Sequence, residues 1–130
     1  MSEAAAEQRA RQLVNARAGG MCEAAIPNVC LGAQHSVHHR RKRRYADTRW
    51  DTSNLLALCG DGTRGCHGQI EANPTWASLQ GYWLWEYEHP LAMPVLIRWA
   101  NQRSWWLLDD EGSMSWNGGK FEDVVLAPRS

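Results

Sequence analysis

The segment VHHRRKRRYADTRWDTSNLLALCGDGTRGCH, residues 37–67, carries most of the chemically reactive side chains of this 130-residue chain. It begins near a pair of histidines, continues through five consecutive basic residues, and ends with two cysteines and a third histidine. Two further cysteines, Cys22 and Cys30, lie just upstream. Because cysteine and histidine are the preferred protein ligands of zinc and related metals, this order predicts a small fold built around metal sites.

The four cysteines form two pairs, with seven residues between the first two and six between the second two. Both pairs enclose turn-forming residues, so each predicts a bent loop. Four thiolates at about 2.3 Å from one Zn²⁺ make a closed structural site. The alternative is four buried or unpaired cysteines. Zinc is favoured, with Cys22, Cys30, Cys59 and Cys66 as its ligands.

Three histidines form a second set. Neighbouring residues on a strand point to opposite faces, so His38 and His39 are not expected to bind the same ion. That divergence suits a division of roles, in which one imidazole binds a metal and the other takes a proton. His67 directly follows Cys66 and is expected to return to the same site.

The five basic residues begin immediately after the histidine pair. A charged run of this kind is often a solvated loop or a nuclear-localisation signal. Beside a candidate metal site it predicts an exposed loop that contacts the phosphates of a nucleic acid. The residues concerned are Arg40, Arg41, Lys42, Arg43 and Arg44.

This arrangement resembles the HNH endonuclease family, in particular small phage-type members with a four-cysteine zinc site and a ββα-metal core. The resemblance covers about residues 20–76. It rests on the four cysteines and on the short motifs VHHR at 37–40, SNL at 53–55, LC at 58–59 and GCH at 65–67.

The resemblance implies a role for each matching residue. His38 and His67 would bind a catalytic divalent metal (Mg²⁺, Mn²⁺, Ni²⁺ or Zn²⁺), and His39 would be the general base that activates water. Asn54 would hold the loop that orients His39, and the cysteines would bind a separate structural Zn²⁺. The implied activity is nicking or double-strand cleavage of DNA.

Two positions depart from the family pattern. Many relatives carry a histidine four residues after the third motif histidine, where this chain has Glu71. A carboxylate there can reach the metal or face solvent, and the sequence leaves both open. Relatives also often have Gly-Gly in the loop before the asparagine, where this chain has YADTRW at residues 45–50.

The remaining chain predicts an α+β fold. Residues 2–17 are expected to form an N-terminal helix with Ser2 as its N-cap and Gly19-Gly20 as its stop, and with Arg9, Arg11 and Arg17 on the outside. Short apolar runs at 82–87, 94–99, 104–108 and 113–116 predict an antiparallel β meander. The expected parts are the helix (1–20), the nuclease core (21–81) and a tryptophan-rich β extension (82–130).

The net charge is zero, but residues 1–70 hold ten basic and six acidic residues, whereas residues 71–130 hold four and eight. The first part therefore suits double-stranded DNA. The acidic second part suits a protein partner, and six of the eight tryptophans lie beyond residue 80. The resemblance suggests phage DNA packaging beside a terminase.

The sequence predicts no membrane span and no signal peptide, and hence a location in the cytoplasm, the host's if the protein is phage-encoded. The alternative is a zinc-stabilised DNA-binding module without catalysis.

Overall fold

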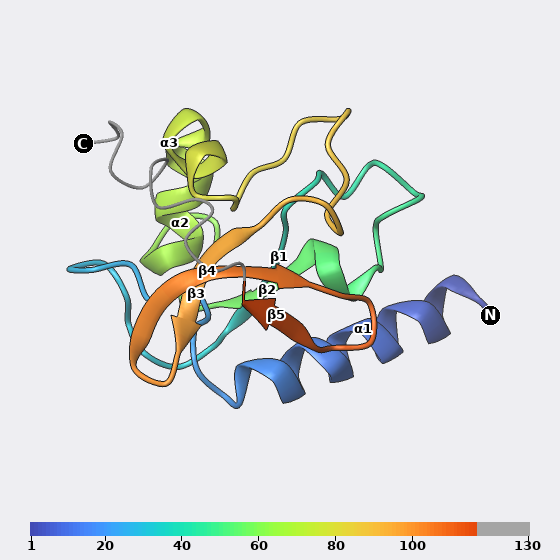
Figure 1. Cartoon of the computed structure of the whole chain (residues 1–130), viewed down its shortest axis with the longest axis horizontal. Coiled ribbons are helices and arrows are strands. Elements are labelled where there is room, and N and C mark those ends of the chain that lie inside the picture. The colour runs from blue at the N-terminus through green and yellow to red at the C-terminus, as the bar shows by residue number, and fades with distance from the viewer. Residues whose placement is uncertain (117–130) are drawn as a thin grey trace.

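The computed structural model describes residues 1–116 as an α+β fold with one long helix, two small antiparallel sheets and two short helices (Figure 1). This confirms the predicted α+β class, the N-terminal helix and a C-terminal antiparallel sheet. Among these residues no helix is long and apolar enough to cross a membrane. The elements are α1 (Glu3–Ala18), β1 (Ser36–His39), the 3-10 turn η1 (Thr52–Asn54), β2 (Leu55–Leu58), α2 (Gly65–Ala72), α3 (Pro74–Leu79), β3 (Val95–Trp99), β4 (Gln102–Leu108) and β5 (Met114–Trp116).

Helix α1 begins and ends where its capping residues predict. The Ser2 hydroxyl accepts a hydrogen bond from the backbone N–H of Ala5 at 3.1 Å. Gly19 adopts a left-handed conformation (φ 63°) and its N–H closes the last turn on the carbonyl of Asn15. A residue with a side chain is disfavoured in that conformation, so glycine ends the helix at low cost.

The prediction that Arg17 lies on the outside of α1 is wrong. Its side chain is 2% exposed and donates to both carboxylate oxygens of Glu23, at 2.7 and 2.9 Å. It also donates to the carbonyl of Leu55 at 2.6 Å. The buried charge is tolerated because a planar guanidinium can satisfy a carboxylate and a carbonyl together. Arg17 therefore fastens α1 to the start of β2.

Strands β1 and β2 pair antiparallel, with His39 opposite Leu55 and Ser36 opposite Leu58. Alternate side chains of β2 point to opposite faces, as strand geometry requires. Leu55 and Ala57 pack with Ala10, Val14 and Ala18 of α1. Leu56 and Leu58 join the larger core on the other face. The two-stranded sheet thus separates α1 from the side of the molecule that carries α2 (Figure 1).

Strands β3, β4 and β5 form the predicted meander, in the order β3-β4-β5. The strand predicted at residues 82–87 does not form. Instead Leu84 makes a single parallel bridge to Arg41, and its N–H donates to the carbonyl of Arg40 at 2.7 Å. The segment's hydrogen bonds therefore go to the basic loop rather than to β3. Residues 117–130 of the predicted C-terminal extension lie outside the described part.

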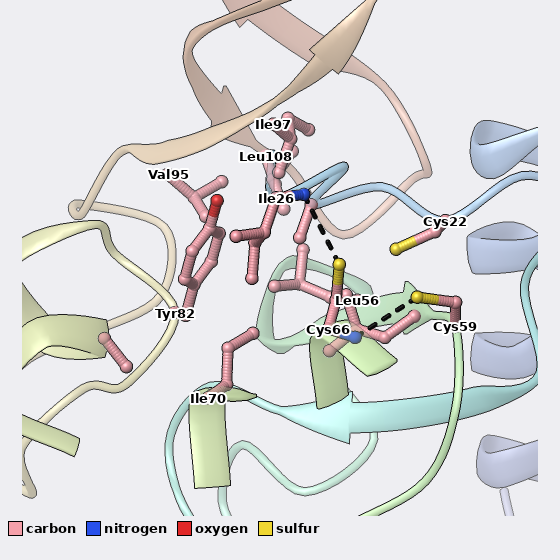
Figure 2. Packing of buried hydrophobic residues seen from close by; sticks show 13 residues of the cluster. Cys22, Ile26, Leu56, Cys59, Cys66, Ile70, Tyr82, Val95, Ile97 and Leu108 are labelled. Atoms are coloured by element: carbon pink, nitrogen blue, oxygen red, sulfur yellow. Dashed lines mark hydrogen bonds between the residues drawn. The ribbon is translucent and has the colours of Figure 1, made fainter. Parts of the chain in front are cut away.

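The larger hydrophobic core draws on all parts of the chain after α1. Figure 2 shows Ile26, Leu56 and Ile70 packed with Tyr82, Val95, Ile97 and Leu108. Each fully buried aliphatic side chain contributes roughly 1.5–3 kcal/mol relative to exposure. The Tyr82 hydroxyl is also satisfied, because it donates to the carbonyl of Leu96 at 2.6 Å and accepts from Arg103 at 2.8 Å. The meander is packed on the cysteine-bearing region through this shared core.

Arg40 is a second buried arginine, and the prediction that it lies in an exposed loop and contacts phosphate is wrong. It is 1% exposed and sits among backbone carbonyls rather than acids. Burial lowers its pKa to about 9, which still leaves it charged at neutral pH. Because its five N–H groups are used inside the fold, Arg40 is unavailable to DNA. The accepting carbonyls belong to Ser53, Gly81, Pro90, Met93 and Pro94, at 2.7–3.4 Å.

Candidate functional site

The four cysteines meet beside the larger core. Cys22 follows α1, Cys30 lies in the next loop, Cys59 follows β2, and Cys66 lies in the first turn of α2. Their sulfur atoms all lie within 4.8 Å of one another, and the sulfurs of Cys30 and Cys59 are 3.9 Å apart. Four ligands at about 2.3 Å around a tetrahedral zinc would be separated by about 3.8 Å. The cluster fits a metal such as zinc, and none of the four is in a disulfide among the described residues.

Backbone N–H groups point at these sulfurs. Those of Leu31 and Cys66 each donate to Cys59 at 3.2 Å, and that of Ile26 donates to Cys66 at 3.3 Å; Figure 2 shows the contacts at Cys66. Hydrogen bonds of this kind stabilise a thiolate, the form that binds metal. The hydrogen bond with Cys66 lowers the pKa of Cys22 to about 5, and the same pairing raises the pKa of Cys66. The thiolate is therefore favoured at Cys22, while Cys66 retains its proton when no metal is bound.

A second group of metal-ligating side chains comprises His38 of β1 with His67 and Glu71 of α2. One oxygen of Glu71 lies 3.4 Å from Nδ1 of His38 and 3.9 Å from Nε2 of His67. Interaction with His38 lowers the pKa of Glu71, and burial lowers the pKa of His67. The sequence left the direction of Glu71 open, and the structure turns its carboxylate toward the two histidines. We call these three residues the triad.

Hydrogen bonds fix which ring nitrogen of each histidine faces Glu71. The carbonyl of Tyr82 lies 2.6 Å from Nε2 of His38, so that nitrogen carries the proton and the lone pair of Nδ1 points at the triad. Ser36 donates its hydroxyl proton to the carbonyl of Gly60 at 2.8 Å and lies 2.7 Å from Nδ1 of His67. Nδ1 of His67 must therefore donate, which leaves the lone pair of Nε2 facing Glu71. Three electron-pair donors converge.

His39 lies on the other face of β1. Its ring meets that of Trp50 edge-on, with centroids 5.1 Å apart. Burial, the largest cause, lowers the pKa of His39 to about 4, so the imidazole is neutral at neutral pH. His38 and His39 thus point to opposite faces of β1, as predicted. Nε2 of His39 is buried and has no hydrogen-bond partner among the described residues.

Asn54 is fully buried and holds the loop after β1. Its side-chain oxygen accepts from the N–H of Arg41 at 2.6 Å. Its side-chain nitrogen donates to the carbonyls of Arg41 and Thr48 at 2.9 and 3.2 Å. All hydrogen-bonding groups of the amide thus face the loop that carries the basic residues and precedes Trp50. The side chain is built to hold that loop in one shape.

The rest of the basic run divides by exposure. Arg41 is largely engaged inside the loop by Asp47 at 2.8 Å, whereas Lys42, Arg43 and Arg44 are exposed. Lys42 and Arg43 line a cavity of about 420 Å³ together with the triad, His39 and Trp83. An open cavity with cations at its edge and the triad on its wall is suited to a phosphate group.

Several residues that contact the three histidines or line the cavity were not predicted from the sequence. Ser36 could have been found, since it lies two residues before His38 and therefore shares its face of the strand. The carbonyl of Tyr82 carries no sequence signal, because any residue can offer a backbone oxygen. Trp83 was considered only as one of the tryptophans beyond residue 80, and Trp50 only as the last residue of the 45–50 loop.

No protein-family model matches the chain, and comparisons with curated proteins and with solved structures found no similar protein. The interpretation of the site therefore rests on its own geometry and on the motif resemblance.

Proposed function

We propose that this protein is a metal-dependent endonuclease of the HNH type that hydrolyses phosphodiester bonds in DNA. The observation that carries the proposal is the convergence of three electron-pair donors in the triad. Two imidazole lone pairs and a carboxylate repel one another unless a metal ion or an added proton lies among them, and the three ligand atoms are close enough to hold one metal ion. The antiparallel pair β1–β2 followed by α2 supports the proposal, because it matches the ββα order that the motifs imply.

The residues of the triad are suited to a divalent metal. His38 would bind through Nδ1, His67 through Nε2, and Glu71 through a carboxylate oxygen, which suits Mg²⁺ or Mn²⁺ as well as Zn²⁺. When bound, such an ion supplies charge stabilisation to phosphoryl and leaving-group oxygens. The four cysteines would hold a separate structural zinc. The hydrogen bonds that His38 donates to the carbonyl of Tyr82 and that His67 donates to the hydroxyl of Ser36 keep both imidazoles in the ligand tautomer.

In this proposal His39 accepts a proton from the attacking water. Its neutral ring suits a base, and Nε2 is its unused nitrogen. Trp50 borders that ring, and the guanidinium of Arg43 rests on Trp50, 5.1 Å from its centroid. The guanidinium of Arg11 lies over the same tryptophan ring, 5.3 Å from its centroid. DNA phosphates would draw both arginines off Trp50, which would let Trp50 move and open His39 to water. Lys42 and Arg44 would add phosphate contacts.

Double-stranded DNA as the target and a role in phage DNA packaging, next to a terminase and in the host cytoplasm, come from the motif resemblance. The unequal charge distribution supports a DNA-facing first part.

A plasmid-nicking assay with Mg²⁺, Mn²⁺, Ni²⁺ or Zn²⁺ tests the proposal. We expect nicking by the wild type and a loss of about 10²- to 10⁴-fold in His39→Ala, the usual contribution of a general base. His35→Ala is the matched control, since His35 is an exposed histidine that does not line the cavity. Equal nicking by His39→Ala and wild type would remove His39 as the base. No nicking with any of the metals would reject the enzyme.

Nε2 of His39 is buried and cannot reach water in this conformation. This observation favours one alternative, a zinc-stabilised DNA-binding module without catalysis. Such a module needs the cysteines and the exposed cations but has no use for a second metal. Titration of the zinc-loaded protein with Mn²⁺ separates the two. The endonuclease predicts a second site that Glu71→Gln weakens, whereas the module predicts DNA binding without that site.

A further inference from the structure

A second cavity, of about 300 Å³, adjoins the first and is lined by aromatic and basic side chains. This volume is at the lower end of the roughly 300–1,000 Å³ that ligand pockets span. We call it the aromatic pocket. Its lining comprises Trp83, Trp85, Tyr87 and Tyr45, the cations Lys42 and Arg44, and Leu84 and Glu86.

Local geometry explains why the rings face outward. Tyr82 and Leu84 point into the core, at 0% and 2% exposure. The intervening Trp83 is half-buried, while Trp85 and Tyr87 are 42% and 82% exposed. The bridge from Leu84 to Arg41 holds this alternation in place. The segment therefore presents an aromatic ring at every second position. Exposed aromatic side chains contribute little to folding stability, and a group of them on the surface indicates a binding site.

The cations of the pocket lie on its rings. The ammonium of Lys42 is 5.2 Å from the centroid of Trp83, and the guanidinium of Arg44 is 5.1 Å from that of Tyr45. The acid at this wall, Glu86, accepts from the hydroxyl of Tyr45 at 3.4 Å. Flat apolar faces with positive charge beside them are complementary to a base attached to a phosphate.

The aromatic pocket and the triad cavity are continuous, since Lys42 and Trp83 line both. A strand whose phosphate lies at the triad would extend its neighbouring nucleotides over Trp83 toward Trp85 and Tyr87. In duplex DNA the faces of the bases are covered by their stacked neighbours. An aromatic side chain can stack only on a base that has left the helix.

We propose that the aromatic pocket binds unpaired nucleotides of single-stranded DNA next to the scissile phosphate, with bases stacked on Trp85 and Tyr87 and phosphates near Lys42 and Arg44. This inference rests on the proposed nuclease function for the placement of the scissile phosphate. It narrows the substrate to DNA that is single-stranded, or locally opened, beside the cut.

Fluorescence anisotropy tests the proposal with labelled oligothymidine and a blunt duplex of equal length, without added divalent metal so that no strand is cut. The variants are Trp85→Ala and Tyr87→Ala. Loss of one stacking residue is expected to weaken oligothymidine binding about tenfold and duplex binding less than about twofold. Trp99→Ala is the matched control, because Trp99 is 55% exposed and lies on the meander, outside both cavities. It is expected to bind both DNAs like the wild type.

The outcomes separate this inference from the proposed function. Equal oligothymidine affinity in Trp85→Ala, Tyr87→Ala and wild type would overturn the aromatic pocket as a DNA site and would point to a protein partner, even if nicking is observed. No oligothymidine binding by the wild type would overturn it as well. Selective loss in the two variants supports it, even if no metal gives nicking and the enzyme is rejected.

Discussion

The cysteine cluster and the triad use neighbouring parts of the chain in opposite environments. Cys22, Cys59 and Cys66 are buried and Cys30 is partly buried, whereas the triad runs from the buried His38 to Glu71, whose side chain is 41% exposed at an open cavity. Four thiolates fill all the coordination positions of a tetrahedral metal. Three donors beside a cavity leave a coordination position free for water or substrate. The open side of the triad, at Glu71, distinguishes it from the closed cysteine cluster.

The scaffold positions the chemistry through the turn between Cys59 and Cys66. The N–H of His67 donates to the carbonyl of Cys59 at 3.2 Å. The carbonyl of Gly60, in the same turn, accepts from Ser36. Gly60 has φ 73°, and a Cβ there would lie 2.1 Å from the carbonyl oxygen of Arg64, so the turn admits no side chain at this position. The shape of the cysteine turn therefore sets where His67 lies.

The largest expected effect comes from breaking the cysteine cluster. Cys59→Ser is expected to lose bound zinc and, with it, the folded state, because structural zinc sites contribute about 10 kcal/mol or more to folding. Metal analysis and thermal unfolding followed by circular dichroism measure both losses.

His67→Ala is the matched test in the triad. It is expected to keep its structural zinc and its melting transition, and to lose the second metal site and nicking. A Cys59→Ser protein that melts like the wild type would contradict the structural role of the cluster. Unfolding of His67→Ala would contradict the division between the two sites.

Local patterns were enough to predict part of this arrangement. Ser2 and Gly19 predicted both ends of α1, since capping depends on residues close in sequence. Strand alternation predicted that His38 and His39 diverge. The cysteine pairs predicted a cluster, because few other arrangements satisfy four thiols in so small a chain.

Long-range contacts account for what the sequence did not predict. Five consecutive cations predict an exposed loop, but Arg40 is buried by carbonyls some 13 to 54 residues away. Arg17 is buried because Glu23 and Leu55 meet at its side chain. Residues 82–87 were predicted to form a strand, but only Tyr82 and Leu84 of this segment are fully buried, and the backbone pairs with the basic loop rather than with a strand. No local pattern encodes such partners.

The basic segment contains both a structural residue, Arg40, and a candidate DNA-binding residue, Lys42. Mutation of each tests this difference. Arg40→Met is expected to lower the free energy of unfolding by about 3 kcal/mol, because it leaves several buried carbonyls without a donor. Lys42→Gln is the control and is expected to change stability by less than about 0.5 kcal/mol, as for exposed positions generally. Urea unfolding of the zinc-loaded proteins measures both.

DNA affinity should show the reverse order. Lys42→Gln is expected to reduce the slope of log affinity against log salt by about one, since one phosphate contact is lost. A stable Arg40→Met with weakened DNA binding would contradict the assignment of Arg40 to the scaffold.

The smallest expected effect tests the link between the two clusters. Ser36→Ala removes the hydroxyl that joins Gly60 to Nδ1 of His67 and so frees the imidazole to rotate or change tautomer. Loss of such a supporting contact typically weakens metal binding about 10- to 100-fold. Calorimetric titration with Mn²⁺ is expected to show this loss while zinc content stays at the wild-type value. Ser36→Thr keeps a hydroxyl at the same position and is expected to restore affinity. If Ser36→Ala instead released zinc, the contact would serve the cysteine turn, and His67 would be positioned by its backbone bond to Cys59 alone.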